Sequence, residues 1–215
     1  MAPLTRPTVA IETHGCKLNQ ADSTTLTSDF LRNGFQVVST TEVPDVYVLN
    51  TCTVTHVADR KARQSLRAVR RLNPNATIVA TGCYAERSPE AIAALDEIDF
   101  VIGNRGKIDL VKKITESRFA MDMPWFNAED NIRLEPGTLK TRIMIKIQEG
   151  CDQVCAYCIV PKVRGREKSI PPKIIIDRIK HHVALGYKEV VLTGTQLGTY
   201  GFDLDKVTLT VLLKR

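Results

Sequence analysis

The sequence GCDQVCAYCIVPKVRGRE, residues 150–167, contains the most informative motif of the chain. It places Cys151, Cys155 and Cys158 in a Cys-x-x-x-Cys-x-x-Cys array, which brings three thiolates onto one short loop. A structural zinc ion takes four protein ligands, whereas a four-iron cluster held by three thiolates keeps one iron open to a small molecule. The array therefore favours an iron–sulfur cluster with a reactive iron. The alternatives are a zinc loop completed by a distant cysteine or histidine, and an accidental group of cysteines.

Length and composition indicate a folded protein of one or two domains. The chain has 215 residues, of which 43% are hydrophobic, enough to fill a core. The N-terminal sequence MAPLTRPTV lacks an apolar signal segment, and no stretch reaches the ~20 apolar residues of a membrane span. We therefore expect a cytoplasmic protein that does not contact a membrane. In a reducing compartment, the six cysteines favour metal or catalytic thiolates over disulfides.

The charge gives weak support for a polyanionic partner such as RNA, because the formal net charge is +6. Six cations form a basic run in one predicted helix: Arg60, Lys61, Arg63, Arg67, Arg70 and Arg71. This run either contacts RNA phosphates or is a solvated helix face whose last cations complement the helix dipole.

Three cysteines in the N-terminal half each follow a predicted strand. The strands are expected at residues 8–11, 43–49 and 77–80, and the cysteines are Cys16, Cys52 and Cys83. Helices predicted between the strands imply a parallel sheet, in which the loops after the strands meet at one edge. These cysteines are then expected to meet there as a second three-thiolate cluster site. The alternative is that they are buried as small hydrophobic side chains.

The predicted helices carry apolar residues at helical spacing. We expect Asn19 or Ser23 to cap the first helix, Gly34 to end it, and Ser88-Pro89 to start another. A further strand is predicted at residues 100–102. The apolar helix faces are Leu26, Phe30 and Leu31; Ala58, Ala62, Leu66 and Val69; and Ile108, Val111 and Ile114.

The C-terminal part begins after a polar stretch rich in turn residues, which we interpret as an interdomain connection over residues 118–140. A strand at 142–148, a helix at 171–185 and a strand at 189–192 follow, with a further helix expected within 205–215. These are the first units of a β/α barrel that does not close within the sequence, so an unpaired sheet edge is expected. The predicted fold class is α/β, with an N-terminal Rossmann-like parallel-sheet domain at 1–117 and the incomplete barrel at 141–215.

The cysteine array, with aromatic Tyr157 before the last cysteine, resembles the motif of the radical S-adenosylmethionine (SAM) enzymes. The resemblance implies that Cys151, Cys155 and Cys158 hold a catalytic [4Fe-4S] cluster whose open iron binds SAM. It also implies that Tyr157 lies beside the adenine of SAM. Thr193, Gly194 and Thr195 occupy the strand end at which related enzymes contact the amino end of SAM.

Within these enzymes the chain resembles the methylthiotransferases, which insert sulfur into a C–H bond and methylate it. The matching motifs are Gly15-Cys16 with Asn19, Asp22 and Ser23; Asn50-Thr51-Cys52 with Ala58; Gly82-Cys83 with Ala85; and Asp99 with Gly103-Asn104. The resemblance implies that Cys16, Cys52 and Cys83 bind an auxiliary [4Fe-4S] cluster associated with sulfur delivery, which makes two clusters in all. His14 and His56, next to these loops, are expected to be neighbours of the cluster rather than its ligands.

The wording of residues 12–23 (ETHGCKLNQADS) and 192–201 (LTGTQLGTYG) resembles the enzymes that act on threonylcarbamoyladenosine beside the anticodon of transfer RNA. The implied partners are the tRNA anticodon stem-loop and an electron donor such as flavodoxin or ferredoxin. Relatives that act on isopentenyl-adenosine or on a ribosomal-protein aspartate remain alternatives. The chain departs from the family in having Ile170 where many members have arginine. Family members are also about twice as long, so an inactive iron–sulfur-binding fragment is a further alternative.

Overall fold

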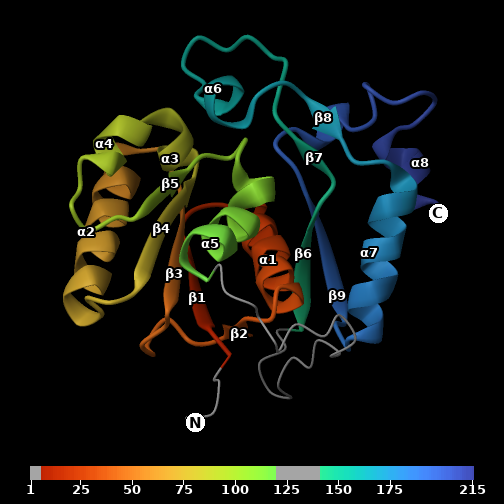
Figure 1. The fold of residues 1–215 in the computed structure, drawn as a ribbon. Helices are drawn as coiled ribbons and strands as arrows, with labels where there is room; N and C mark the ends of the chain where they lie inside the picture. The colour runs from red at the N-terminus through yellow and green to blue at the C-terminus, as the bar shows by residue number, and fades with distance from the viewer. Residues whose placement is uncertain (1–5, 120–140) are drawn as a thin grey trace. The chain divides into compact units, whose positions relative to one another are not determined.

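The computed structural model describes residues 6–119 and 141–215. The described residues form two compact units, one from β1 to α5 and one from β6 to α8 (Figure 1). The predicted connection at 118–140 lies outside the described residues, apart from its first two positions. No helix among the described residues is long and apolar enough to cross a membrane.

The first unit contains a five-stranded parallel sheet in the order β2-β1-β3-β4-β5. Its strands are β1 (Thr8–Thr13), β2 (Gln36–Val37), β3 (Val46–Thr51), β4 (Thr77–Gly82) and β5 (Phe100–Ile102). Every residue of the central strands β3 and β4 is buried, as expected when helices cover both faces of a parallel sheet. The predicted parallel sheet is confirmed.

Helices pack on both faces of this sheet (Figure 1). They are α1 (Lys17–Arg32), α2 (His56–Leu72), α3 (Cys83–Arg87), α4 (Pro89–Ala93), the 3₁₀ helix η1 (Lys107–Asp109) and α5 (Leu110–Arg118). One core contains Phe30 of α1 and Ile114 of α5 against β1 and β3. The core on the other face contains Leu66 of α2 and Ile92 of α4. The sheet therefore lies between two layers of helices, with one apolar core on each face.

Several boundaries differ from the sequence-based prediction. Cys16 takes the N-cap position of α1, so Asn19 and Ser23 lie inside the helix and do not cap it. β3 begins at Val46 rather than Val43, because Pro44 has no N–H to donate to a neighbouring strand and Val43 is 74% exposed. Ile108 is 87% exposed in η1, and Leu110 packs in the core in its place.

The second unit is built on the parallel pair β6 (Arg142–Lys146) and β9 (Glu189–Thr193), joined through α7 (Pro172–Ala184). Its other elements are β7 (Gln148–Glu149), β8 (Lys168–Ser169), α6 (Val160–Arg164), η2 (Leu197–Thr199) and α8 (Leu209–Leu213). The predicted alternation is confirmed, since Ile143, Ile145 and Ile147 are all buried in one core. Within the described residues β6 and β9 pair only with each other.

Two features of this unit differ from the sequence-based prediction. β7 and β8 form a short antiparallel pair, with Gln148 opposite Ser169. The helix expected within 205–215 is reduced to α8, which the hydroxyl of Thr208 caps by accepting from the N–H of Val211. Ile170, at the position where many family members have arginine, packs against the core, and its carbonyl accepts a hydrogen bond from the Tyr200 hydroxyl.

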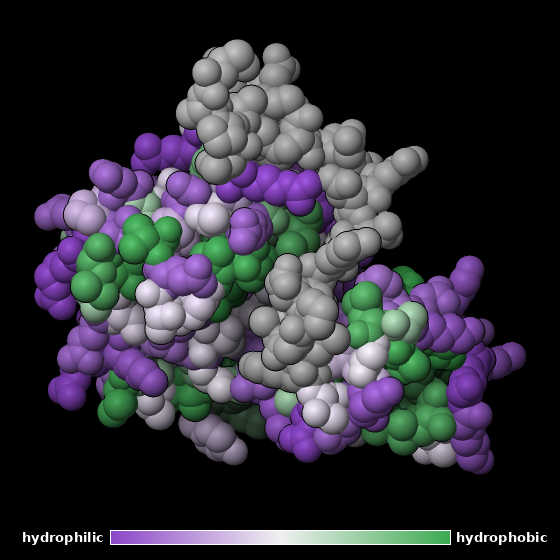
Figure 2. Space-filling model, turned by 90° about the horizontal axis from the view of Figure 1, so that it is seen from below, coloured by the Kyte–Doolittle hydropathy of each residue, from purple (hydrophilic) through white to green (hydrophobic). Residues whose placement is uncertain are grey.

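The surface seen from below carries hydrophilic residues with groups of hydrophobic residues between them (Figure 2). Cys16, Cys52 and Cys83 of the first unit each follow the carboxyl end of a strand, so they do not lie at the edge of the sheet where the strands begin. The functional site is therefore to be sought at the strand ends.

Candidate functional site

Cys16, Cys52 and Cys83 lie at the carboxyl ends of three neighbouring strands of the first unit, β1, β3 and β4. Cys16 precedes α1, Cys52 directly follows β3, and Cys83 is the first residue of α3. All three are free thiols; Cys16 is exposed, Cys83 is half-buried and Cys52 is buried. Burial raises the pKa of the Cys52 thiol, and the neighbouring Cys83 and Cys16 raise it further. The three loops lie at the same edge of the sheet, at the carboxyl ends of its strands, as expected from the sequence.

Two glycines let the cysteine loops approach the end of β3. Gly15 has φ +96°, and a Cβ added there would lie 2.6 Å from Cβ and 2.8 Å from Sγ of Cys52. Gly82 has φ +93°, and an added Cβ would lie 2.6 Å from Oδ1 of Asn50. Only glycine combines a left-handed conformation with such close contacts. The glycines before Cys16 and Cys83 are therefore required by the geometry of the site.

A buried polar network joins these loops. The Asn19 side-chain amide donates to the carbonyl of His14 (2.7 Å) and to that of Thr51 (2.9 Å). The Asn50 amide donates to the carbonyl of Asn19 (2.9 Å) and to Oγ of Ser23 (3.0 Å). Because these groups are excluded from water, breaking one contact leaves an unsatisfied polar atom. The network explains the motif asparagines as supports of the cysteine loops.

A second connection runs from the residue after Cys52 to the helix that begins with Cys83. The Thr53 hydroxyl donates to Asp59 (2.7 Å), and the same buried carboxylate accepts from Arg87 at 2.7 Å. Arg87 is the last residue of α3. This connection was not predicted from the sequence.

Polar groups also lie directly beside the cysteines. The Asn104 amide nitrogen lies 3.6 Å from Sγ of Cys83, within hydrogen-bond range for sulfur. The Lys107 ammonium donates to the side-chain carbonyls of Asn104 (2.8 Å) and Asn50 (3.2 Å). His14, expected to be a neighbour rather than a ligand, contacts the Glu12 carboxylate at 2.6 Å through Nε2.

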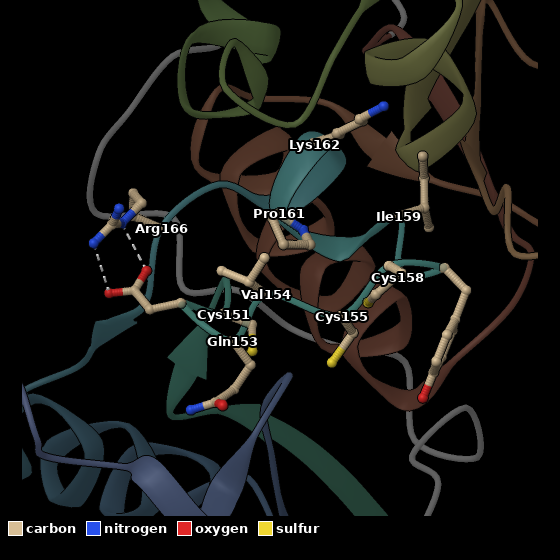
Figure 3. A pocket seen from close by; sticks show the side chains of 12 residues that line it. Cys151, Gln153, Val154, Cys155, Cys158, Ile159, Pro161, Lys162 and Arg166 are labelled. Atoms are coloured by element: carbon tan, nitrogen blue, oxygen red, sulfur yellow. Dashed lines mark hydrogen bonds and ion pairs between the residues drawn. The ribbon is translucent and has the colours of Figure 1, made fainter.

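The second cysteine set lies on the loop between β7 and α6. Cys151, Cys155 and Cys158 are free thiols that line one cavity of about 410 Å³ with Pro161 and Lys162 (Figure 3). The carbonyl of Cys155 accepts a hydrogen bond from the N–H of Cys158 at 3.1 Å, so the last two thiols lie on one tight turn.

Contacts at the base of the loop hold it closed. Gly150, with φ +75°, lies directly against the carbonyl of Arg166, and the N–H of Cys151 donates to the carbonyl of Gly165 at 3.2 Å. Asp152 forms an ion pair with Arg166 at 2.7 Å and accepts from the N–H of Glu167 at 3.0 Å. Gly150, Cys151 and Asp152 at the start of the loop are therefore tied to residues 165–167 at its end, and Cys155 and Cys158 lie between these contacts.

Gln148, fully buried, connects this loop to the end of β9. Its Nε2 donates to the carbonyl of Gly150 (3.0 Å), and its Oε1 accepts from the N–H groups of Thr195 (2.8 Å) and Gln196 (2.9 Å). Thr193, Gly194 and Thr195, the predicted SAM contacts, thus lie on a segment tied to the cysteine loop. The side chain of Tyr157 is 93% exposed beside the same cavity.

Charged side chains flank the strand that enters the loop. Glu149 contacts Lys146 at 2.7 Å and Arg164 at 2.6 Å. Although burial opposes the change, the ammonium of Lys146 and the guanidinium of Arg164 lower the pKa of Glu149. The carboxylate is therefore held ionised beside the cysteine loop.

Both cysteine sets suit a four-iron cluster. Among the described residues no three His, Cys, Asp or Glu side chains are grouped to hold a single metal ion. A four-iron cluster does not require such convergence, because each thiolate binds a different iron. Free thiols at both sites, an N–H donor at Cys83 and a cavity lined by the second set fit this group.

The basic run on α2 is partly used inside the first unit. Arg63 donates to the Tyr84 hydroxyl (2.6 Å), Arg67 pairs with Glu97 (3.6 Å) and Arg70 pairs with Asp99 (2.7 Å). The other three cations of the run, Arg60, Lys61 and Arg71, are exposed. The structure therefore gives half of the run a structural role and leaves the other half available to a partner.

Among known proteins, a family model matches the N-terminal part of the chain, and individual relatives match most of it. The family described as "Uncharacterized protein family UPF0004" matches residues 8–103, which include Cys16, Cys52 and Cys83. Threonylcarbamoyladenosine tRNA methylthiotransferase MtaB of Aquifex aeolicus is 41% identical over 91% of this chain and 49% of its own length. By sequence, the chain is similar to the methylthiotransferases over most of its length.

Other methylthiotransferases match less strongly. MtaB of Bacillus subtilis is 37% identical over 96% of this chain and 47% of its own. The tRNA-2-methylthio-N(6)-dimethylallyladenosine synthase of Oceanobacillus iheyensis is 32% identical over 92% and 40%. The chain thus spans about half the length of the curated methylthiotransferases it matches.

A solved structure supports the fold. The radical S-adenosylmethionine methyltransferase TsrM of Kitasatospora setae, solved with tryptophan substrate and a SAM analogue, aligns with a TM-score of 0.62. The alignment covers 97% of this chain and 50% of TsrM at 16% identity, so it shows the fold alone. The α/β fold predicted from the alternation of strands and helices is confirmed.

Proposed function

We propose that the chain is part of a tRNA methylthiotransferase that catalyses the radical SAM-dependent 2-methylthiolation of N6-threonylcarbamoyladenosine next to the anticodon. The observation that carries the proposal is the arrangement of the cysteines. In the first unit three free thiols follow three parallel strands, and in the second unit three free thiols lie on the single loop between β7 and α6. The relatives named MtaB supply the substrate class.

In this proposal Cys151, Cys155 and Cys158 hold the catalytic [4Fe-4S] cluster, and Cys16, Cys52 and Cys83 hold the auxiliary [4Fe-4S] cluster. When bound, the clusters and SAM supply the one-electron chemistry that activates a C–H bond. The residues of the chain itself bind and orient the clusters and SAM. Free thiols become thiolate ligands, and binding releases their protons.

The segment of Thr193, Gly194 and Thr195 would contact the amino end of SAM, and Tyr157 would lie beside its adenine. The hydrogen bonds of Gln148 to Thr195 and to Gly150, at the start of the cysteine loop, support this arrangement. Fixing both contacts before the substrate arrives lowers the entropic cost of a productive geometry.

The partners in this proposal are the tRNA anticodon stem-loop and an electron donor of the flavodoxin or ferredoxin type, in the cytoplasm. The exposed cations Arg60, Lys61 and Arg71 would contribute to phosphate contacts. In this proposal the N-terminal domain at 1–117 binds the auxiliary cluster, and the incomplete radical SAM domain at 141–215 binds the catalytic cluster. Residues 118–140 connect the two domains. The alternatives are a methylthiotransferase of isopentenyl-adenosine, to which the synthase of O. iheyensis points, or of a ribosomal-protein aspartate, and an iron–sulfur-binding fragment without activity.

The first test is the iron and sulfide content after anaerobic reconstitution, with absorption and electron paramagnetic resonance spectra. We expect about eight irons per chain for two four-iron clusters, and about four when Cys151, Cys155 and Cys158 are all replaced by alanine. Stoichiometric zinc without iron would overturn the proposal.

The second test is activity. Chain 1–215 is incubated with SAM, a reductant and tRNA carrying either threonylcarbamoyladenosine or isopentenyl-adenosine, and the nucleosides are analysed by mass spectrometry. Methylthiolation of the first tRNA alone supports the proposal. Modification of the second tRNA supports the first alternative, and cluster binding without SAM cleavage supports the inactive fragment.

A further inference from the structure

Asn104 and Lys107 form a polar pair at Cys83 that the methylthiotransferase motifs do not assign to any task. Asn104 follows β5, and Lys107 begins η1 three residues later. The Asn104 amide nitrogen lies 3.6 Å from Sγ of Cys83, while its carbonyl accepts from the Lys107 ammonium at 2.8 Å. Both side-chain atoms of the amide are thus engaged, one by the sulfur and one by the lysine.

This geometry fixes which end of the amide faces the sulfur. An ammonium only donates hydrogen bonds, so it selects the oxygen of Asn104 and turns the N–H toward Cys83. Lys107 is itself held by the side-chain carbonyl of Asn50 at 3.2 Å. Asn50 is in turn fixed by its bonds to Asn19 and Ser23, so the orientation is built into the folded first unit.

We propose that Asn104, oriented by Lys107, is a positioning residue that donates an N–H···S hydrogen bond to the Cys83 thiolate of the auxiliary cluster. This hydrogen bond raises the reduction potential of the cluster. The inference rests on the proposed function, because it requires a cluster on Cys16, Cys52 and Cys83. Hydrogen bonds to the sulfurs are one of the means by which a protein sets the potential of an iron–sulfur cluster.

The physical reason is the change of charge on reduction. One electron enters the cluster and increases the negative charge shared by its sulfurs. A hydrogen bond to a charged acceptor is stronger than one to a less charged acceptor, so the N–H stabilises the reduced cluster more than the oxidised one. Removing the N–H therefore lowers the potential.

The test uses chain 1–215 with Cys151, Cys155 and Cys158 replaced by alanine, so that the auxiliary cluster is the only cluster present. The reconstituted protein is titrated with dithionite in the presence of mediator dyes, and the reduced fraction is followed by electron paramagnetic resonance. Asn104→Leu replaces the amide by an apolar group of similar shape. We expect the ratio of reduced to oxidised cluster at a fixed potential to fall by up to roughly fivefold, which corresponds to a whole hydrogen bond, because only the stabilisation gained on reduction counts.

Lys107→Met is the second variant, because it keeps the amide but removes the ammonium to which the oxygen of Asn104 is bound. Its shift should have the same sign and be smaller than that of Asn104→Leu. Asn75→Leu and Lys112→Met are matched controls, since both residues are exposed on the first unit and each change removes the same kind of group. Neither control should change the potential.

Two failures are distinguishable in this experiment. If the parent with three alanines binds no iron, the auxiliary cluster itself is absent and the proposed function fails. If it binds about four irons and both Asn104→Leu and Lys107→Met leave the potential at the control value, the role of Asn104 is wrong while the proposed function stands. A shift in Lys112→Met equal to that in Lys107→Met would also overturn it, because net charge alone would then explain the change.

Discussion

The side chain of Gln148 accepts a hydrogen bond from the backbone N–H of Thr195 at 2.8 Å, and this contact joins two loops that are far apart in the sequence. The same side chain donates to the carbonyl of Gly150 at the start of the cysteine loop. One buried residue therefore sets the position of the cysteine loop relative to the end of β9.

Replacing Gln148 by leucine should destabilise the second unit and weaken SAM binding. The change leaves the N–H groups of Thr195 and Gln196 and the carbonyl of Gly150 without their partner, at a cost of about 2–4 kcal/mol in the free energy of unfolding. Chemical denaturation and SAM titration by calorimetry measure the two effects. Gln196→Leu, an exposed control in the same segment, should change neither, and unchanged SAM affinity in Gln148→Leu would contradict the positioning role.

Gly15→Ala and Gly82→Ala should each abolish iron binding at the first-unit site. Alanine is strained at the positive φ of both residues, by about 1–2 kcal/mol, and its Cβ meets Cys52 in one case and Asn50 in the other. The iron content should fall from about eight to about four per chain, with the second site intact. Gly198→Ala is the control, because nothing lies within 4 Å of its added Cβ. Full iron content in both variants would show that the loops do not need these close contacts.

Asp59→Ala should lower the stability of the first unit by about 2 kcal/mol. The change removes a buried carboxylate that accepts from Thr53 and Arg87, and hydrogen bonds to charged groups contribute more than neutral ones. Denaturation monitored by circular dichroism measures the loss. Asp29→Ala removes a half-exposed partner of Arg32 and should cost under about 0.5 kcal/mol. Equal costs for the two variants would contradict the structural role of Asp59.

The free energy of unfolding should decrease as the pH is lowered through the range in which His182 titrates. Burial lowers the pKa of His182 from 6.5, and the neighbouring His181 and Arg178 add to the effect. The unfolded chain therefore takes up the proton first, so stability is lost as the pH falls through 6.5 toward the folded-state pKa. Denaturation midpoints at pH 7.5 and 5.5 should differ less in His182→Phe than in the wild-type chain. The same difference in both would exclude His182 as the source.

Much of the fold follows from patterns that are local in the sequence. Alternation of Ile143, Ile145 and Ile147 predicted β6 and its buried side, and the apolar residues 100–102 predicted β5 to the residue. The pair β7 and β8 was not predicted, because each strand has only two residues and all four are polar. Such strands owe their pairing to the loop between them rather than to their own periodicity.

The candidate site divides in the same way. The six cysteines could be found from their spacing and their positions after strands, and the motif asparagines from the resemblance. The contacts of Gln148 with Thr195 and of Asp59 with Arg87 depend on how distant segments meet, so no local pattern contains them. The roles of Arg63 and Arg70 also required the structure, because their partners Tyr84 and Asp99 lie on other elements.

The two cysteine sets differ in what must happen before each can bind iron. Cys151, Cys155 and Cys158 lie within a single short loop, so little chain entropy opposes bringing them together. Cys16, Cys52 and Cys83 follow three separate parallel strands, whose pairing involves contacts between residues distant in the sequence and is therefore slow. We expect the first-unit site to appear only once its sheet has assembled. During synthesis and refolding, the rate of sheet formation would then limit the loading of that site with iron.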